Sequence, residues 1–138
     1  MGNTKRKREN LRLSKLSEAD ITCLKTFYAR TQAPEDARHL SRVFSALNRP
    51  QDTIEWLIKV YDHNPSYNVA LHILQHHEDA KLYEGALDWL DRMETDLKNG
   101  VYGPLKQNRK AKKIDEDFKR IRQQMYKEQL SYEHATDI

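Results

Sequence analysis

The clearest signal of the fold lies in PEDARHLSRVFSALNRPQDTIEWLIKVYDHNP, residues 34–65. Pro34 and Pro50 each stand where a helix can begin, because the N–H that proline lacks would be unpaired in the first turn anyway. Apolar residues follow each proline at helical spacing: Leu40, Val43, Phe44 and Leu47, and then Ile54, Leu57, Ile58 and Tyr61. Two helices joined by so short a turn are expected to pack as an antiparallel hairpin.

Further helices are expected on both sides of this hairpin. Ser17, with Asp20 three residues later, resembles a capping box and predicts a helix over about 17–31. Another helix is expected after Pro65, and Asp79 is expected to cap the next one, which ends near Gly100. The composition agrees, since 4 Gly and 4 Pro among 138 residues leave few breaks. These patterns predict an all-α fold of stacked antiparallel hairpins.

The last helix is expected from about Pro104 to the low 130s. Its apolar stripe is narrow and lies on a strongly charged helix; it consists of Ile114, Phe118, Ile121 and Met125. We expect this stripe to cap the exposed end of the hairpin array, and a partner-binding coiled segment is the alternative.

Charge divides the chain into three parts. Residues 1–16 carry six bases and one acid, residues 17–104 nine bases and fourteen acids, and residues 105–138 nine bases and six acids. We expect a flexible basic arm over 1–14, a helical-repeat domain over 15–103, and a basic amphipathic helix over 104–138 that packs on the repeats or extends from them.

Residues 34–65 resemble a tetratricopeptide repeat. The pattern of that family is matched by Ala37, Leu40-Ser41, Phe44, Thr53, Leu57, Val60 and Pro65, and Trp56-Leu57 recurs 33 residues later as Trp89-Leu90. Residues 66–98 match only at the later positions, Ala86, Leu90 and Met93, with a turn that reads about three residues longer and no closing proline. The resemblance implies a short right-handed array.

The resemblance also implies a binding groove, because in such arrays the first helix of each hairpin lines the concave surface. The residues placed there are Arg38, Arg42, Ser45, Asn68, His72, Gln75 and His76. Their side chains suit an acidic peptide or a terminal carboxylate, and a plain solvated helix face is the alternative.

The segment LHILQHHED, residues 71–79, holds three of the six histidines. His72 and His76 lie one helical turn apart and point to one side, whereas His77 is expected to turn toward the core. A zinc site would need a further ligand, and there is neither an HExxH motif nor a cysteine pair. We therefore predict a polar helix face and no metal.

Basic clusters at both ends are candidate phosphate contacts. They comprise Lys5, Arg6, Lys7 and Arg8, and then Lys106, Arg109, Lys110, Lys112 and Lys113. The first cluster would also serve as a nuclear localisation signal in a eukaryotic cell. No aromatic residues interleave with these bases, so no stacking platform for single strands is expected.

Function is therefore expected to be non-enzymatic and to need no cofactor. The sequence holds no Gly-rich phosphate loop and no patterned nucleophile. The leading hypothesis is an adaptor that binds a partner protein, and the alternative is an RNA- or DNA-associated protein that grips phosphates with its basic ends. No membrane span is expected, and the single cysteine, Cys23, suits an intracellular, cytoplasmic protein and reads as a small buried thiol. The oligomeric state stays open.

Overall fold

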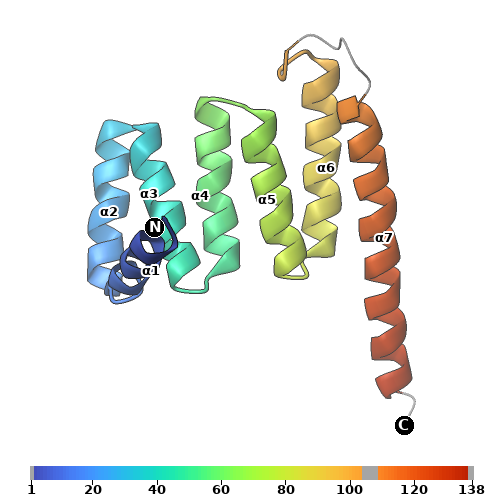
Figure 1. The fold of residues 1–138 in the computed structure, drawn as a ribbon, viewed down its shortest axis with the longest axis horizontal. Helices are drawn as coiled ribbons and strands as arrows, with labels where there is room; N and C mark the ends of the chain where they lie inside the picture. The colour runs from blue at the N-terminus through green and yellow to red at the C-terminus, as the bar shows by residue number, and fades with distance from the viewer. Residues whose placement is uncertain (1, 104–108, 137–138) are drawn as a thin grey trace. The chain divides into compact units, whose positions relative to one another are not determined.

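The computed structural model describes residues 2–103 and 109–136, with side chains over 4–103 and 109–130. Over these residues the chain forms helices and no strand, so the predicted all-α class is confirmed. The helices are α1 (Gly2–Leu13), α2 (Glu18–Thr31), α3 (Pro34–Ala46), α4 (Pro50–His63), α5 (Tyr67–Asp79), α6 (Tyr83–Lys98) and α7 (Arg109–Thr136) (Figure 1). The chain divides between Pro65 and Ser66 into two compact units, where the sequence predicted one repeat domain over 15–103.

The first unit is built on α2, α3 and α4, which run alternately up and down (Figure 1). Both expected proline starts are present, with Pro34 opening α3 and Pro50 opening α4. The capping box is also present: Asp20 N–H donates to Ser17 Oγ over 3.2 Å, and Ser17 N–H donates to Asp20 Oδ2 over 2.9 Å. The core of this unit consists of Leu13, Ile21, Tyr28, Ala37, Leu40, Val43, Phe44, Trp56 and Val60.

The second unit is built on α5, α6 and α7, with α6 packed against both of the others. Ser66 caps α5 by accepting the N–H of Val69 over 3.2 Å. Trp89 of α6 donates its indole N–H to the carbonyl of Ala70 in α5 over 2.9 Å. Among the side chains of the unit that the structure describes, the buried ones are Ala70, Ile73, Leu74, His77, Ala86, Trp89, Leu90, Met93, Leu97, Ile114, Asp117, Phe118 and Ile121.

The predicted stripe of α7 is buried at Ile114, Phe118 and Ile121. Between them lies Asp117, only 1% exposed, whose Oδ1 accepts from Lys113 Nζ over 2.8 Å and from Arg120 Nη1 over 2.7 Å. These two bonds compensate the buried carboxylate. The expected start of this helix at Pro104 lies outside the described residues.

The hairpins α3–α4 and α5–α6 correspond at an offset of 33 residues, from Pro34 to Tyr67 and from Pro50 to Tyr83. Both turns hold three residues, with left-handed Asn48 (φ 56°) in one and Lys81 (φ 58°) in the other. The longer second turn that we expected is therefore wrong. Asp79 also does not cap α6; it is the last residue of α5 and accepts a hydrogen bond from Gln75.

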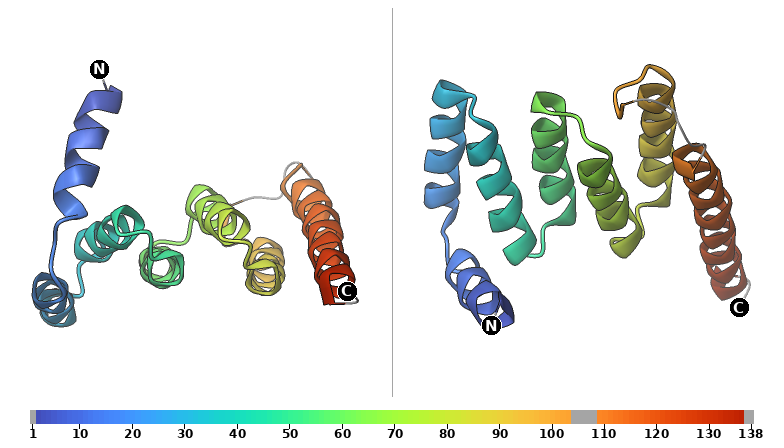
Figure 2. Two further views of the ribbon diagram at one scale, coloured as in Figure 1. Left: turned by 90° about the horizontal axis from the view of Figure 1, so that it is seen from below. Right: turned by 45° about the horizontal axis from the view of Figure 1, so that its top comes forward.

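The correspondence extends backward to α1. This helix ends at Leu13, 33 residues before Ala46, and the bonds Ser14 N–H to Asn10 O and Lys15 N–H to Arg12 O repeat those that close α3. A helix therefore stands where we expected a flexible arm, because lysine and arginine are good helix formers. Figure 2 shows α1 directed away from α2 and α3, and Leu13 alone is buried among residues 4–13, the part of α1 whose side chains the structure describes.

Candidate functional site

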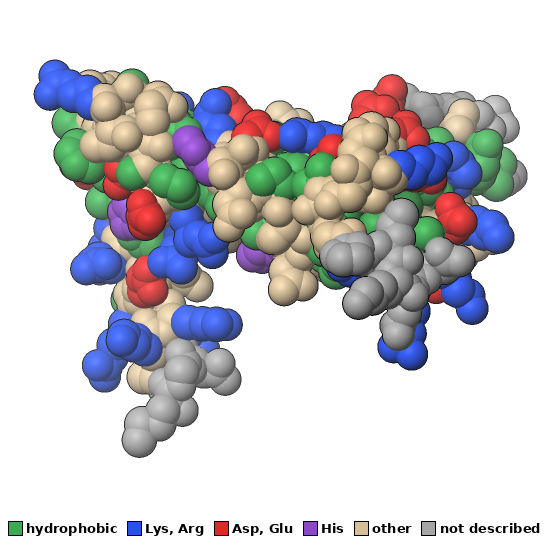
Figure 3. All heavy atoms as spheres, turned by 90° about the horizontal axis from the view of Figure 1, so that it is seen from above, with side chains coloured by type: hydrophobic (Ala, Val, Ile, Leu, Met, Phe, Trp, Pro, Cys, Tyr) green, Lys and Arg blue, Asp and Glu red, His purple; other side chains and the backbone are tan. Residues whose placement is uncertain are grey.

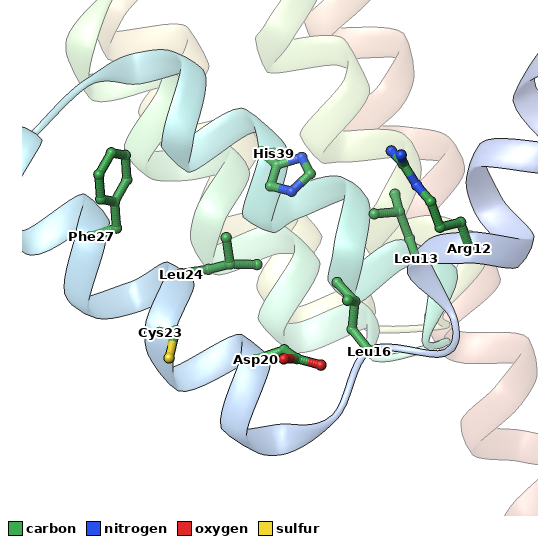
Figure 4. Close-up of a pocket in the computed structure, with 8 residues that line it drawn as sticks. All are labelled: Arg12, Leu13, Leu16, Asp20, Cys23, Leu24, Phe27 and His39. Atoms are coloured by element: carbon green, nitrogen blue, oxygen red, sulfur yellow. The ribbon is translucent and has the colours of Figure 1, made fainter.

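A pocket of about 500 Å³ opens in the first unit where α1, α2 and α3 meet (Figure 4). It is lined by Arg12, Leu13, Leu16, Asp20, Cys23, Leu24, Phe27 and His39. Most of this lining is apolar, and Phe27 is 56% exposed. An exposed phenylalanine beside other apolar side chains is typical of an interaction surface.

Cys23 and Asp20 are the pocket residues of α2 whose exposure and hydrogen bonds the structure defines most clearly. Cys23 is exposed, so the expected buried thiol is wrong: none of the described helices covers its side chain. Asp20 is occupied by the capping box, and the hydrogen bond from the Ser17 backbone lowers its pKa. The polar groups left free at the rim are therefore Arg12 and His39.

The predicted groove residues fall into the two units. Arg38, Arg42 and Ser45 are all exposed on α3, in the first unit. In the second unit, Asn68, His72 and Gln75 are exposed on α5 and His76 is partly buried. The structure thus places each set along one helix.

The histidines of α5 lie as the sequence predicted. The rings of His72 and His76 have centroids 4.9 Å apart, and burial, together with the nearby His72, lowers the pKa of His76. His77 is buried, and its Nδ1 lies 3.0 Å from the carbonyl oxygen of Ile73, so the neutral ring donates there. Burial lowers the pKa of His77 as well.

The two basic clusters differ in how many of their side chains bond to other groups of the protein. Lys5, Arg6, Lys7 and Arg8 are exposed along α1, the arm at the lower left of Figure 3. At the other end Arg109 and Lys112 are exposed. Lys113 pairs with Asp117, Lys110 donates to the Tyr102 carbonyl over 3.3 Å, and Lys106 lies outside the described residues.

Within the described part of the chain, no three or more His, Cys, Asp and Glu side chains gather as a metal site would require. Across the same residues, no helix has the length and apolar character needed to cross a membrane. The chain matches no family model, no curated protein and no solved structure.

Sequence reasoning missed the pocket and its central residues, Cys23, Leu24 and Phe27. A signal was present in the sequence. Aligning residues 1–31 with 34–64 at the offset of 33 sets the polar residues of 1–13 against the apolar stripe of the hairpin's first helix. That comparison would have predicted that residues 1–13 cannot pack on the apolar side of 17–31 and that this side stays exposed.

Proposed function

We propose that the protein is a non-enzymatic adaptor: a short, right-handed, tetratricopeptide-like array that binds a partner protein through its first-of-pair helices, α3 and α5. The observation that carries this proposal is the correspondence between the hairpins. Both α3 and α5 bury one side in their own unit, and one groove position is exposed in both helices: Arg42 of α3 and its counterpart Gln75 of α5. Polar side chains along an exposed helix face are suited to binding a peptide segment of a partner.

The chemistry of these faces favours an acidic ligand. Arg38 and Arg42 offer guanidinium groups on α3, and Asn68, His72 and Gln75 offer N–H donors on α5. Such groups bind carboxylates by charge-assisted hydrogen bonds, so we expect an acidic peptide segment or a chain terminus.

Variants of the 138-residue chain test this proposal. Arg42→Glu combined with His72→Ala should abolish capture of the partner proteins that co-purify with the wild type, while circular dichroism shows an intact fold. Arg30→Glu, an exposed charge reversal on α2, is the matched control and should leave capture unchanged. Normal capture by the folded double variant would refute the proposal.

Binding to RNA or DNA is the second candidate, favoured by the exposed charges of Lys5 to Arg8 on α1. Binding through about six phosphates should weaken by roughly a thousandfold between 50 and 200 mM salt. Replacing all four residues with glutamine should reduce the salt dependence of the affinity. If the affinity still falls steeply with salt, α1 is not the phosphate-binding segment. The same basic run would direct the protein to the nucleus of a eukaryotic cell; otherwise we expect it in the cytoplasm.

A further inference from the structure

One side of α2 lacks the covering helix that its counterparts have. The offset of 33 pairs Ile21 with Ile54 and Tyr28 with Tyr61, identical residues that are buried in both helices. The same offset pairs Asp20, Cys23 and Phe27 of α2 with Thr53, Trp56 and Val60 of α4, and with Ala86, Trp89 and Met93 of α6. All six of those counterparts are buried, whereas the three residues of α2 are exposed.

In the case of α4, the covering helix is α3. Trp56 and Val60 belong to the same core as Ala37, Leu40 and Phe44 of α3, each of which is 0% exposed. These α3 residues follow the spacing i, i+3 and i+7, which places them on one side of a helix. The side of α4 that carries Trp56 and Val60 therefore packs against a small residue, a leucine and an aromatic residue at this spacing.

Helix α1 holds the corresponding place in the sequence but cannot supply this stripe. Thr4, Lys7 and Leu11 stand where α3 has Ala37, Leu40 and Phe44. Burying Lys7 without a partner would be costly, and Leu11 stays 60% exposed. Therefore α1 extends away, and the pocket beside Leu24 and Phe27 stays open (Figures 2 and 4).

The charge at the pocket selects among possible occupants. Helix α1 carries five bases and a single acid, Glu9, and its Arg12 lines the pocket. Asp20 adds one negative charge to the lining, and the five bases of α1 outnumber it together with Glu9. An occupant with acidic residues beside its apolar stripe would be attracted to this rim.

We propose that this pocket binds an acidic amphipathic helix of a partner protein, seated antiparallel to α2 as α3 is to α4. Its small residue, leucine and aromatic residue would pack on Cys23, Leu24 and Phe27, and its acidic side chains would face Arg12 and the bases of α1. The partner's helix would thereby form a hairpin-like pair with α2. None of the pocket residues belongs to the polar faces of α3 and α5 proposed above.

The chain's own α3 supplies the probe. The peptide Pro34–Ala46, held helical by a side-chain bridge and carrying Arg38→Glu and Arg42→Glu, keeps the stripe and adds acidic flanks. Cys23 is the sole cysteine of the 138-residue sequence, so its alkylation by iodoacetamide reports on the pocket in this chain. At a peptide concentration about ten times Kd, one pocket in ten or so stays free, and alkylation should slow about tenfold.

Two protein variants and one peptide control locate the binding. Phe27→Ala should weaken peptide binding about tenfold, whereas Leu130→Ala, which truncates an equally exposed apolar residue on α7, should not. Arg12→Glu should weaken binding more at 50 than at 500 mM salt. The peptide with its original arginines should bind less tightly than the acidic one.

Several results would overturn the proposal. Peptide binding that survives Phe27→Ala, or an absence of Cys23 protection up to millimolar peptide, would remove the pocket as its site. Equal binding of the basic and acidic peptides would remove the charge preference. Self-association in sedimentation equilibrium that Phe27→Ala abolishes would assign the pocket to a second copy of this chain. Partner capture that responds to His72→Ala but not to Phe27→Ala would leave the proposed function standing and refute this inference.

Discussion

His77 takes in α5 the place that Phe44 takes in α3. The carbonyl of Phe44 accepts the N–H of Arg49 over 3.0 Å, and the carbonyl of His77 accepts the N–H of Leu82 over 2.8 Å, so each residue closes its helix in the same way. Phe44 is 0% exposed and His77 is 7% exposed. The second unit thus carries a titratable ring where the first carries a plain aromatic one.

Stability of the second unit should fall as the pH is lowered through the range of histidine. Burial lowers the pKa of His77 in the folded state, with the Ile73 hydrogen bond and then Asp88 opposing the shift, and burial also lowers the pKa of His76. Below the unfolded value of about 6.5, the unfolded chain binds a proton that the folded chain does not. The stability that these neutral histidines contribute is therefore fully present above that pH, and it is lost as the pH falls toward their folded pKa. Hydrogen exchange of α5 amides at pH 7 and pH 5 measures the loss.

His77→Phe should reduce that pH dependence, because it installs the side chain that α3 uses at the same place. His72→Phe, at an exposed site, is the control and should keep most of the pH dependence. An unchanged slope in His77→Phe would show that His77 does not carry the effect.

Gly85→Ala should destabilise the protein although alanine is the better helix former. A Cβ added at Gly85 would lie 3.0 Å from Cδ2 and 3.2 Å from Nε2 of His77, whose buried ring has little room to retreat. The helix preference of about 1 kcal/mol for alanine should emerge when the ring is removed, so Gly85→Ala should stabilise a His77→Ala background. A double-mutant cycle in urea measures both signs. Equal effects in the two backgrounds would contradict the steric explanation.

Lys81→Gly should stabilise the second unit by about 1 kcal/mol, because Lys81 has φ 58° and pays the left-handed penalty that glycine avoids. Its surface ion pair with Glu128, at 3.7 Å, contributes little in return. Asn48→Gly at the corresponding turn should gain less, since asparagine tolerates φ 56° better. Urea midpoints compare the two, and a loss in Lys81→Gly would count against this explanation.

Asp117→Asn should cost about 2 kcal/mol, because it weakens two charge-assisted bonds to a buried group. Lys113 and Arg120 are about half exposed, so they can return to water and limit the loss. The nearby Asp115→Asn, at an exposed position, should be nearly neutral. Hydrogen exchange along α7 distinguishes the two variants, and equal protection in both would refute a structural role for Asp117.

Local chemistry made much of the fold predictable. Pro34 and Pro50 opened their helices as expected, and the capping box of Ser17 and Asp20 formed. These features depend on residues close in sequence, where spacing determines geometry. The stripe of α7 was predictable for the same reason, since Ile114, Phe118 and Ile121 share one helix side.

Features that depend on distant packing were not predictable in this way. The second turn was misread because Lys81 adopts a left-handed conformation that sequence rules reserve for glycine and asparagine. Cys23 was expected to be buried because its helix looked apolar, but exposure depends on whether another helix arrives. The predicted groove residues are exposed except His76, which is partly buried, and the division between Pro65 and Ser66 separates them into two units.

The matched turns after Ala46 and Asp79 also bear on how such a chain can change in length. Arg49 N–H to Phe44 O and Leu82 N–H to His77 O are equivalent bonds in equivalent three-residue junctions. A crossover between gene copies misaligned by 33 codons would join one junction to the other with each of these bonds retained. Duplication or deletion of a whole hairpin would then leave its new junction already able to close, so unequal recombination offers this sequence a route to longer and shorter forms.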